Sequence, residues 1–95
     1  MDRSINFYNG ILGMEIVERK TSPRGSKLVF LRFPDTNCEL ELCSFPGSGS
    51  IEVPEDLVHL AFQVEDLDQC MSKLKEKGVP ITEGSIETGS GTRFI

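Results

Sequence analysis

The sequence predicts a small α+β fold built from two similar modules. Three apolar, strand-like stretches in the first half are separated by short turns, at the spacing of hairpins. The second half contains one stretch whose apolar residues recur at helical spacing. A chain of 95 residues is sized for a single domain with a small core.

The first half is expected to begin with a short helix over residues 4–9. Asp2 or Ser4 is a candidate cap for this helix, and Gly10 and Gly13 are candidate stop signals. Strands are expected over residues 14–21, 27–33 and 38–45. The segments between them are rich in Pro, Gly, Asp, Asn and Ser, which are typical turn residues.

The second half is expected to begin after a linker over residues 47–56, which is rich in Gly and Ser at its start. A strand is expected over residues 57–64, followed by a helix that Asp66 caps and Gly78 ends. The apolar positions of that helix are Leu67, Cys70, Met71 and Leu74. A strand or strand pair is expected over residues 79–86, and a last strand begins at Thr92.

An internal repeat joins the two halves. A shift of 65 residues places Gly13 on Gly78 and Ile16 on Ile81, so both halves read helix, glycine, strand. Each half then resembles one strand–helix–strand–strand–strand module. The first module (1–46) lacks its first strand and the second (57–95) lacks its last, so we expect either a fragment or strands supplied by partner chains.

Composition and charge exclude several classes of protein. The net charge is −5, and residues 52–68 carry six acidic side chains without a basic one. A protein that binds a phosphate backbone usually presents a basic surface, so we expect no nucleic-acid partner. No apolar run has the length of a membrane span, and no secretory signal opens the chain, so the cytoplasm is the expected compartment and no membrane association is expected.

Three cysteines, Cys38, Cys43 and Cys70, are an odd number without a C-x-x-C pair. This pattern argues against a disulfide framework and against a thiolate zinc site. We expect them to be small apolar core residues.

Three segments resemble one known superfamily, in its order. Residues 3–14 resemble its R-S-x-x-F-Y-x-x-x-L-G-M segment, residues 39–42 its x-x-E-L strand, and residues 59–66 its H-I-A-F-x-V-x-D strand. The chain therefore resembles the glyoxalase/bleomycin resistance/extradiol dioxygenase (vicinal oxygen chelate) superfamily, and within it the lactoylglutathione lyases (glyoxalase I). In that family, paired βαβββ modules form a cup that holds a divalent metal, usually at a dimer interface.

The resemblance implies a lyase or isomerase that acts on a small carbonyl adduct with Zn, Ni, Fe or Mn, usually as a homodimer. The family's metal ligands, two His and two Glu, fall on Glu41 and His59 and on the two absent strands; the catalytic base falls beyond Ile95. Gln63 and Phe45 are candidate substrate-binding residues. Because two ligands rarely hold a catalytic metal tightly, we expect this chain alone to be inactive.

Other interpretations remain open. Without the resemblance, Glu41 reads as part of a solvated sheet face, and His59 as a hydrogen-bonded structural residue. Acidic Glu55 and Glu83 stand where lactoylglutathione lyases tend to have basic residues, which favours a metal-free module that binds a ligand or drug, as bleomycin resistance proteins do. An acyl-CoA epimerase or a ring-cleaving dioxygenase is a third possibility.

Overall fold

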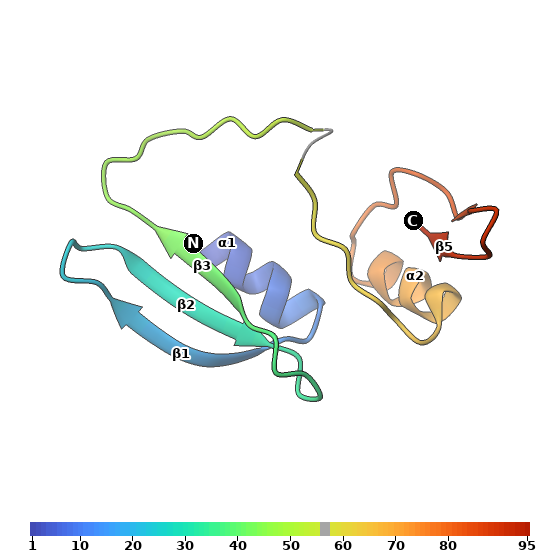
Figure 1. Cartoon of the computed structure of the whole chain (residues 1–95), viewed down its shortest axis with the longest axis horizontal. Coiled ribbons are helices and arrows are strands. Elements are labelled where there is room, and N and C mark those ends of the chain that lie inside the picture. Colours follow the sequence, from blue (N-terminus) through green and yellow to red (C-terminus); the bar gives the residue numbers. More distant parts are fainter. Residues whose placement is uncertain (56–57) are drawn as a thin grey trace. The chain divides into compact units, whose positions relative to one another are not determined.

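The structure is a computed structural model that describes residues 1–55 and 58–95. The chain divides into two compact units, Met1–Val53 and Pro54–Ile95, each with helical and antiparallel strand elements (Figure 1). The predicted α+β class is therefore confirmed. The boundary between the units falls within the predicted linker, while the assignment of the units to two repeated modules stays a prediction. Among the described residues, no helix has the length and apolar character needed to cross a bilayer.

The first unit begins with a helix that changes its winding. The α-helix α1 (Asp2–Ile5) continues directly into the π-helix η1 (Asn6–Ile11). Met1 is the N-cap and makes no side-chain cap hydrogen bond, so the prediction of a cap by Asp2 or Ser4 is wrong, because both residues lie inside the first turn. Gly13 ends the helix with a φ of +79°, a conformation that glycine adopts without steric cost.

Three antiparallel strands follow in the order β1-β2-β3. Their bounds are β1 Glu15–Thr21, β2 Lys27–Arg32 and β3 Leu40–Ser44, which confirms the three predicted strands with a shorter third one. The turn between β1 and β2 is closed at Ser22, whose N–H donates to the Ser26 carbonyl at 2.8 Å. The Ser22 hydroxyl in turn accepts the Ser26 N–H at 3.0 Å.

A β-bulge interrupts the pairing of β1 with β2. Ile16 lies opposite Leu31, but Phe30 lies opposite Glu18, so Val17 is an extra residue without a partner position. The bulge keeps Ile16 on the same face as Leu31 and brings Glu18 to the face of Phe30.

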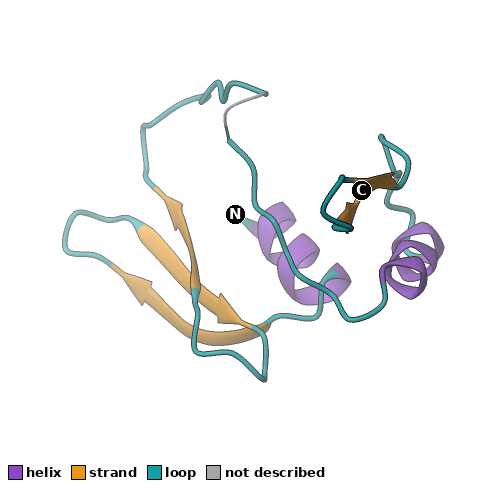
Figure 2. Cartoon of the chain, turned by 45° about the vertical axis from the view of Figure 1, so that its right-hand side comes forward, coloured by secondary structure: helices purple, strands orange, loops and turns teal. Residues whose placement is uncertain are grey.

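The core of the first unit lies between the helix and one face of the sheet (Figure 2). Met14, Val29 and Leu31 are buried there, and Leu31 has no exposed surface. Partly buried residues from the helical segment, from β1 and β3 and from the positions just before α1 and just after β2 pack against them: Met1, Ile5, Tyr8, Ile16, Phe33, Leu40 and Leu42. This arrangement leaves the opposite face of the sheet uncovered by the helix.

The second unit contains the helix α2 (Leu67–Glu76). Asp66 caps it, since its carboxylate accepts the Gln69 N–H at 2.9 Å, as the sequence predicts. Gly78, with a φ of +77°, ends the helix. There the Gly78 N–H donates to the Lys75 carbonyl and the Val79 N–H to the Leu74 carbonyl, the two hydrogen bonds of a Schellman motif.

A short hairpin follows the helix. It consists of β4 (Ile86–Glu87) and β5 (Arg93–Phe94), joined by a turn in which the Gly91 N–H donates to the Thr88 carbonyl at 3.0 Å. The expected last strand is confirmed at residues 93–94, but the strand expected over residues 79–86 is wrong except at Ile86. The polar, glycine-containing stretch 82–85 has no extended partner in the described chain, so no ladder forms there.

The strand predicted over residues 57–64 is also wrong for residues 58–64, which form no regular secondary structure; Leu57 lies outside the described residues. Val58 and Leu60 are 61% and 56% exposed. Alternating apolar residues specify which face of a strand would be buried, but a strand also needs a neighbour to accept its hydrogen bonds. No such neighbour pairs with residues 58–64 within the described chain.

The predicted core position of the cysteines is wrong for two of the three. Cys38 and Cys43 are exposed and Cys70 is half-buried, and all three are free thiols. Cys43 lies on β3 between half-buried Leu42 and Ser44, so strand alternation turns it away from the core.

Candidate functional site

The uncovered face of the first unit's sheet carries Glu41. Leu40 and Leu42, its neighbours on β3, pack against the core, so the side chain of Glu41 points to the opposite face. Glu41 is exposed, and its position lies opposite Phe30 on β2. We call this face the open face; it is defined by strand alternation and register as the face of Glu15, Glu18, Lys20, Leu28, Phe30, Arg32, Glu41 and Cys43.

An apolar strip lies at the middle of the open face. Leu28 and Phe30 occupy alternate positions of the central strand β2, and both are half-buried although the helix lies on the other side. The ammonium group of Lys20 lies 5.4 Å from the centre of the Phe30 ring. The same ammonium lies 3.1 Å from a carboxylate oxygen of Glu18, so Lys20 has two favourable electrostatic contacts.

Arg32 is the last residue of β2 on the open face. It is half-buried and lies opposite Glu15 of β1. Its Nε atom is buried and has no hydrogen-bond partner among the described residues. The sequence interpretation assigned no role to Arg32. The available signal is a guanidinium directly after residues 28–31, which are apolar on both faces of the strand.

Phe45, a predicted substrate-binding residue, lies directly after β3. Its side chain is 42% exposed, and the guanidinium of Arg24 lies 5.7 Å from its ring centre. The Phe45 carbonyl accepts hydrogen bonds from the Ser48 hydroxyl at 2.9 Å and from the Ser48 N–H at 3.3 Å. These contacts hold the chain at the point where it leaves the sheet, and they leave part of the ring open to solvent.

The other two predicted site residues, His59 and Gln63, belong to the second unit. Both are exposed and lie in the segment without regular secondary structure. Glu41 and Phe45 belong to the first unit. The structure thus places one candidate metal ligand and one candidate substrate residue in each unit.

The donor types fit a divalent metal, but their number does not. A carboxylate and an imidazole suit Zn²⁺, Ni²⁺, Fe²⁺ or Mn²⁺. Within residues 1–55 and 58–95, however, no three His, Cys, Asp or Glu side chains are grouped so that they could hold an ion. Glu41 and His59 therefore remain two separate candidate ligands, and the described residues do not form a complete metal site.

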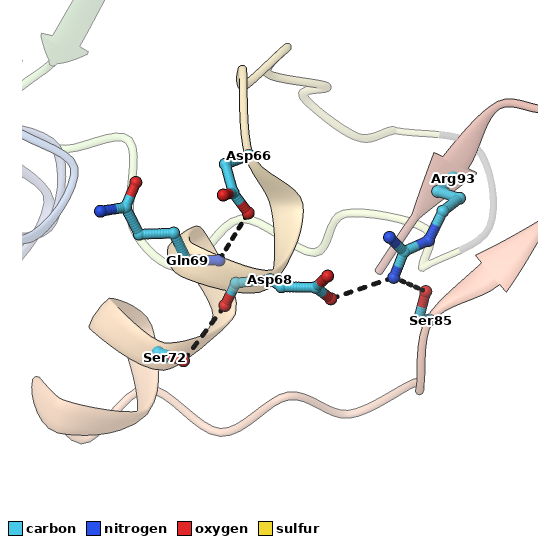
Figure 3. A network of polar contacts seen from close by, with 6 residues as sticks. All are labelled: Asp66, Asp68, Gln69, Ser72, Ser85 and Arg93. Carbon is cyan, nitrogen blue, oxygen red and sulfur yellow. Dashed lines mark hydrogen bonds and ion pairs between the residues drawn. The ribbon is translucent and has the colours of Figure 1, made fainter.

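The second unit contains a polar network of structural character (Figure 3). An Nη atom of Arg93 on β5 lies 3.1 Å from Asp68 on α2 and 3.1 Å from the Ser85 hydroxyl. The hydrogen bond and positive charge of Arg93 lower the pKa of Asp68, and Asp68 raises the pKa of Arg93. The network connects the hairpin to the helix, and none of the predicted site residues takes part in it.

A shallow cavity of about 420 Å³ lies in the first unit, between the start of the chain and one end of the strands. Its lining consists of Met1, Asp2, Arg19, Lys20, Thr21, Lys27, Leu28, Val29 and Ser44. It includes none of the predicted site residues, so it does not represent the candidate site.

Comparisons with known proteins identify the family. The family model described as "Glyoxalase/Bleomycin resistance protein/Dioxygenase superfamily" matches residues 1–95. A probable lactoylglutathione lyase of Synechocystis is 31% identical over 98 aligned positions, which cover 100% of this chain and 75% of that protein. A lactoylglutathione lyase of Neisseria meningitidis is 26% identical and is covered to 71% of its length.

A solved structure agrees with the sequence matches. The trypanothione-dependent glyoxalase I of Leishmania major superposes with a TM-score of 0.74 at 28% sequence identity. The superposition covers 98% of this chain and 74% of that protein. With a family model that spans every residue, the chain belongs to the glyoxalase/bleomycin resistance protein/dioxygenase superfamily.

Proposed function

We propose that this chain is a module of a lactoylglutathione lyase-type enzyme, which acts on the adduct of a thiol with a small 2-oxoaldehyde. The observation that carries the proposal is the position of Glu41, an exposed carboxylate on the uncovered face of the sheet beside an apolar strip. The names of the similar proteins support the same reaction class.

Each site residue has a role in this proposal. Glu41 and His59 supply an oxygen and a nitrogen ligand for a divalent metal, Zn²⁺, Ni²⁺, Fe²⁺ or Mn²⁺. Leu28 and Phe30 form the apolar floor against which the adduct lies. Phe45 and Gln63, both exposed, contact the substrate. The remaining ligands come from outside the described residues, and the working enzyme is a homodimer.

The metal positions are tested by titration of the chain with Ni²⁺ in a calorimeter. Glu41→Gln keeps the size of the side chain and removes its charge, and we expect it to weaken binding by about tenfold or more. Glu39→Gln is the matched control, because Glu39 is also exposed and precedes Glu41 by two residues. His59→Gln is expected to act like Glu41→Gln. Equal affinities of the Glu41→Gln and Glu39→Gln variants would contradict the metal role of Glu41.

The reaction is tested in two forms of the protein, with the hemithioacetal of methylglyoxal and glutathione as substrate. We expect the 95-residue chain alone to show no turnover, because it supplies two metal ligands. The second form is a chimera in which this chain replaces the matching region of the Synechocystis relative, so that the relative's flanking segments are present. We expect metal-dependent turnover there, and its loss in the Glu41→Gln chimera. A chimera that folds and binds Ni²⁺ without turnover would exclude this reaction.

A second candidate function is a metal-free binding module. It is favoured by Glu55 and Glu83, exposed acidic residues at positions where the resemblance leads one to expect basic ones. Under this hypothesis a cationic aromatic drug raises the melting temperature without metal. A rise that persists in Glu41→Gln and disappears in Glu55→Gln would favour it over the lyase.

The homodimer is tested by light scattering of the chain after size exclusion, with and without Ni²⁺. A mass of one chain across the accessible concentration range would count against it. The predicted cytoplasmic location stays a prediction.

A further inference from the structure

We propose that Arg32 on the open face binds a carboxylate group of the ligand and so selects acidic thiol adducts over neutral ones. This inference rests on the proposed function, since it concerns the ligand that lies beside Glu41. It assigns a specificity role to a residue whose buried Nε atom has no hydrogen-bond partner among the described residues.

The position of Arg32 follows from the register of the sheet. Val29 and Leu31 on β2 are buried against the helix, so Phe30 and Arg32 point to the open face. Glu41 lies opposite Phe30, two positions from Arg32. Such diagonal neighbours on adjacent strands are within reach of a long side chain, so the guanidinium and the candidate metal ligand border the same part of the face.

The guanidinium has hydrogen-bonding capacity that the fold does not use. Its Nε is buried without a partner among the described residues, which costs free energy because the atom has lost its contact with water. Glu15, directly opposite on β1, forms no ion pair with Arg32 within 4 Å in the described chain. A structural arginine would be expected to pair with this neighbour.

The other basic residue of the open face, Lys20, already contacts neighbouring side chains. Lys20 lies 3.1 Å from Glu18 and 5.4 Å from the ring centre of Phe30, so it already has two electrostatic partners on this face. Arg32, with its planar arrangement of donors, is therefore the group on the open face that is best suited to receive a carboxylate through two parallel hydrogen bonds.

The apolar strip next to Arg32 indicates the shape of the ligand. Phe30 is the next residue on this face of β2, followed by Leu28, so a ligand with one apolar arm and one carboxylate matches the surface.

The test compares two probes that differ in charge. S-hexylglutathione carries two carboxylates and an apolar arm, and its diethyl ester lacks both negative charges. We measure their dissociation constants for the full chain without metal, by calorimetry. We expect the unmodified chain to bind the acid at least tenfold more tightly than the ester, and we expect Arg32→Met to abolish that preference without weakening the ester. Arg32→Lys should keep part of the preference, because it keeps the charge and loses the paired donors.

The control variant is Arg19→Met. Arg19 lies opposite Val29 and so on the other face of the same sheet, and its replacement removes the same charge. It should leave the acid-to-ester ratio within twofold of its starting value. An equal effect of Arg19→Met and Arg32→Met would overturn the proposal in favour of a general charge effect.

The remaining outcomes of these binding measurements also test the proposed role of Arg32. Loss of ester binding in Arg32→Met would mean a packing role, and absence of an acid preference in the unmodified chain would overturn the proposal. If Arg32→Met fails to fold by circular dichroism, the Arg32→Lys ratio decides: an unchanged preference would refute the paired contact. Because these measurements use no metal and no turnover, failure of the lyase hypothesis in the chimera would be seen separately.

Discussion

The two units of the chain differ in how they are stabilised. The first has three buried residues, Met14, Val29 and Leu31, between a helix and a three-stranded sheet. In the second unit, none of the described residues 58–95 is buried, and its strands are two residues long. Similar local signals thus produce a packed unit in one case and an exposed one in the other, because burial depends on having a sheet to pack against.

The ends of the two helices show how similar the local signals are. Gly13 and Gly78, which coincide in the internal repeat, have φ values of +79° and +77°. In the second unit the Val79 N–H reaches back five residues to Leu74, and in the first the Met14 N–H reaches back six residues to Tyr8. The extra residue matches the wider π winding of η1.

Mutations of packed side chains are expected to show the largest difference between the units in the free energy of unfolding. Leu31→Ala empties a site with no exposed surface and should lower the free energy of unfolding by about 3 kcal/mol. Leu74→Ala in the second unit truncates a half-buried side chain and should cost about 1 kcal/mol or less. Urea unfolding followed by circular dichroism measures both. Equal losses would mean that the second unit has a core as important as the first.

Substitutions at the two glycines that end the helices, Gly13 and Gly78, compare the stability of the two units with a smaller expected effect. Gly13→Ala and Gly78→Ala each force a side chain into a positive φ and should cost about 1 kcal/mol. Gly10→Ala is the control, because its φ is not positive and an added Cβ meets nothing within 4 Å. Amide hydrogen exchange then shows in which unit each substitution lowers the stability. If Gly78→Ala changed exchange in β2, the two units would be energetically coupled.

The smallest expected effect is the pH dependence of the second unit. Arg93 lowers the pKa of Asp68 in the folded chain, so the ion pair contributes stability above the ordinary carboxyl pKa of about 4. This contribution is lost as the pH falls through the lowered pKa. Thermal unfolding of the chain and of Asp68→Asn should therefore differ slightly at pH 7 and converge in acid. A difference that grows below pH 4 would contradict this assignment.

Much of the first unit could be predicted from the sequence. The strands were visible because residues 28–31 are apolar on both faces and because Leu40 and Leu42 alternate with Glu39 and Glu41. The cap at Asp66 and the stop at Gly78 were visible because both act through local hydrogen bonds. Residues 58–64 were predicted wrongly because their alternation indicates a face, whereas strand formation depends on a neighbour that the pattern does not specify.

The site was predictable only in part. Glu41 was found through its resemblance to a family motif, and its position on the open face agrees with the alternation of β3. Arg32 was missed because a charged residue at the end of a strand is usually solvated. What distinguishes it is a buried Nε atom that has no hydrogen-bond partner in the described part of the chain. Whether Glu41 and His59 share an ion stays a prediction.

The extra residue at Val17 has a consequence for comparing related chains. From Glu18 to the end of β1, each side chain lies on the opposite face from the one that an unbroken alternation through Val17 would give it. Deleting Val17 would place Glu18 directly after Ile16 and opposite Phe30, which restores a regular ladder and leaves residues 18–21 on the faces that they already occupy. A homologue that lacks this residue should therefore keep the same order of polar and apolar positions in that stretch, on a strand without the bulge.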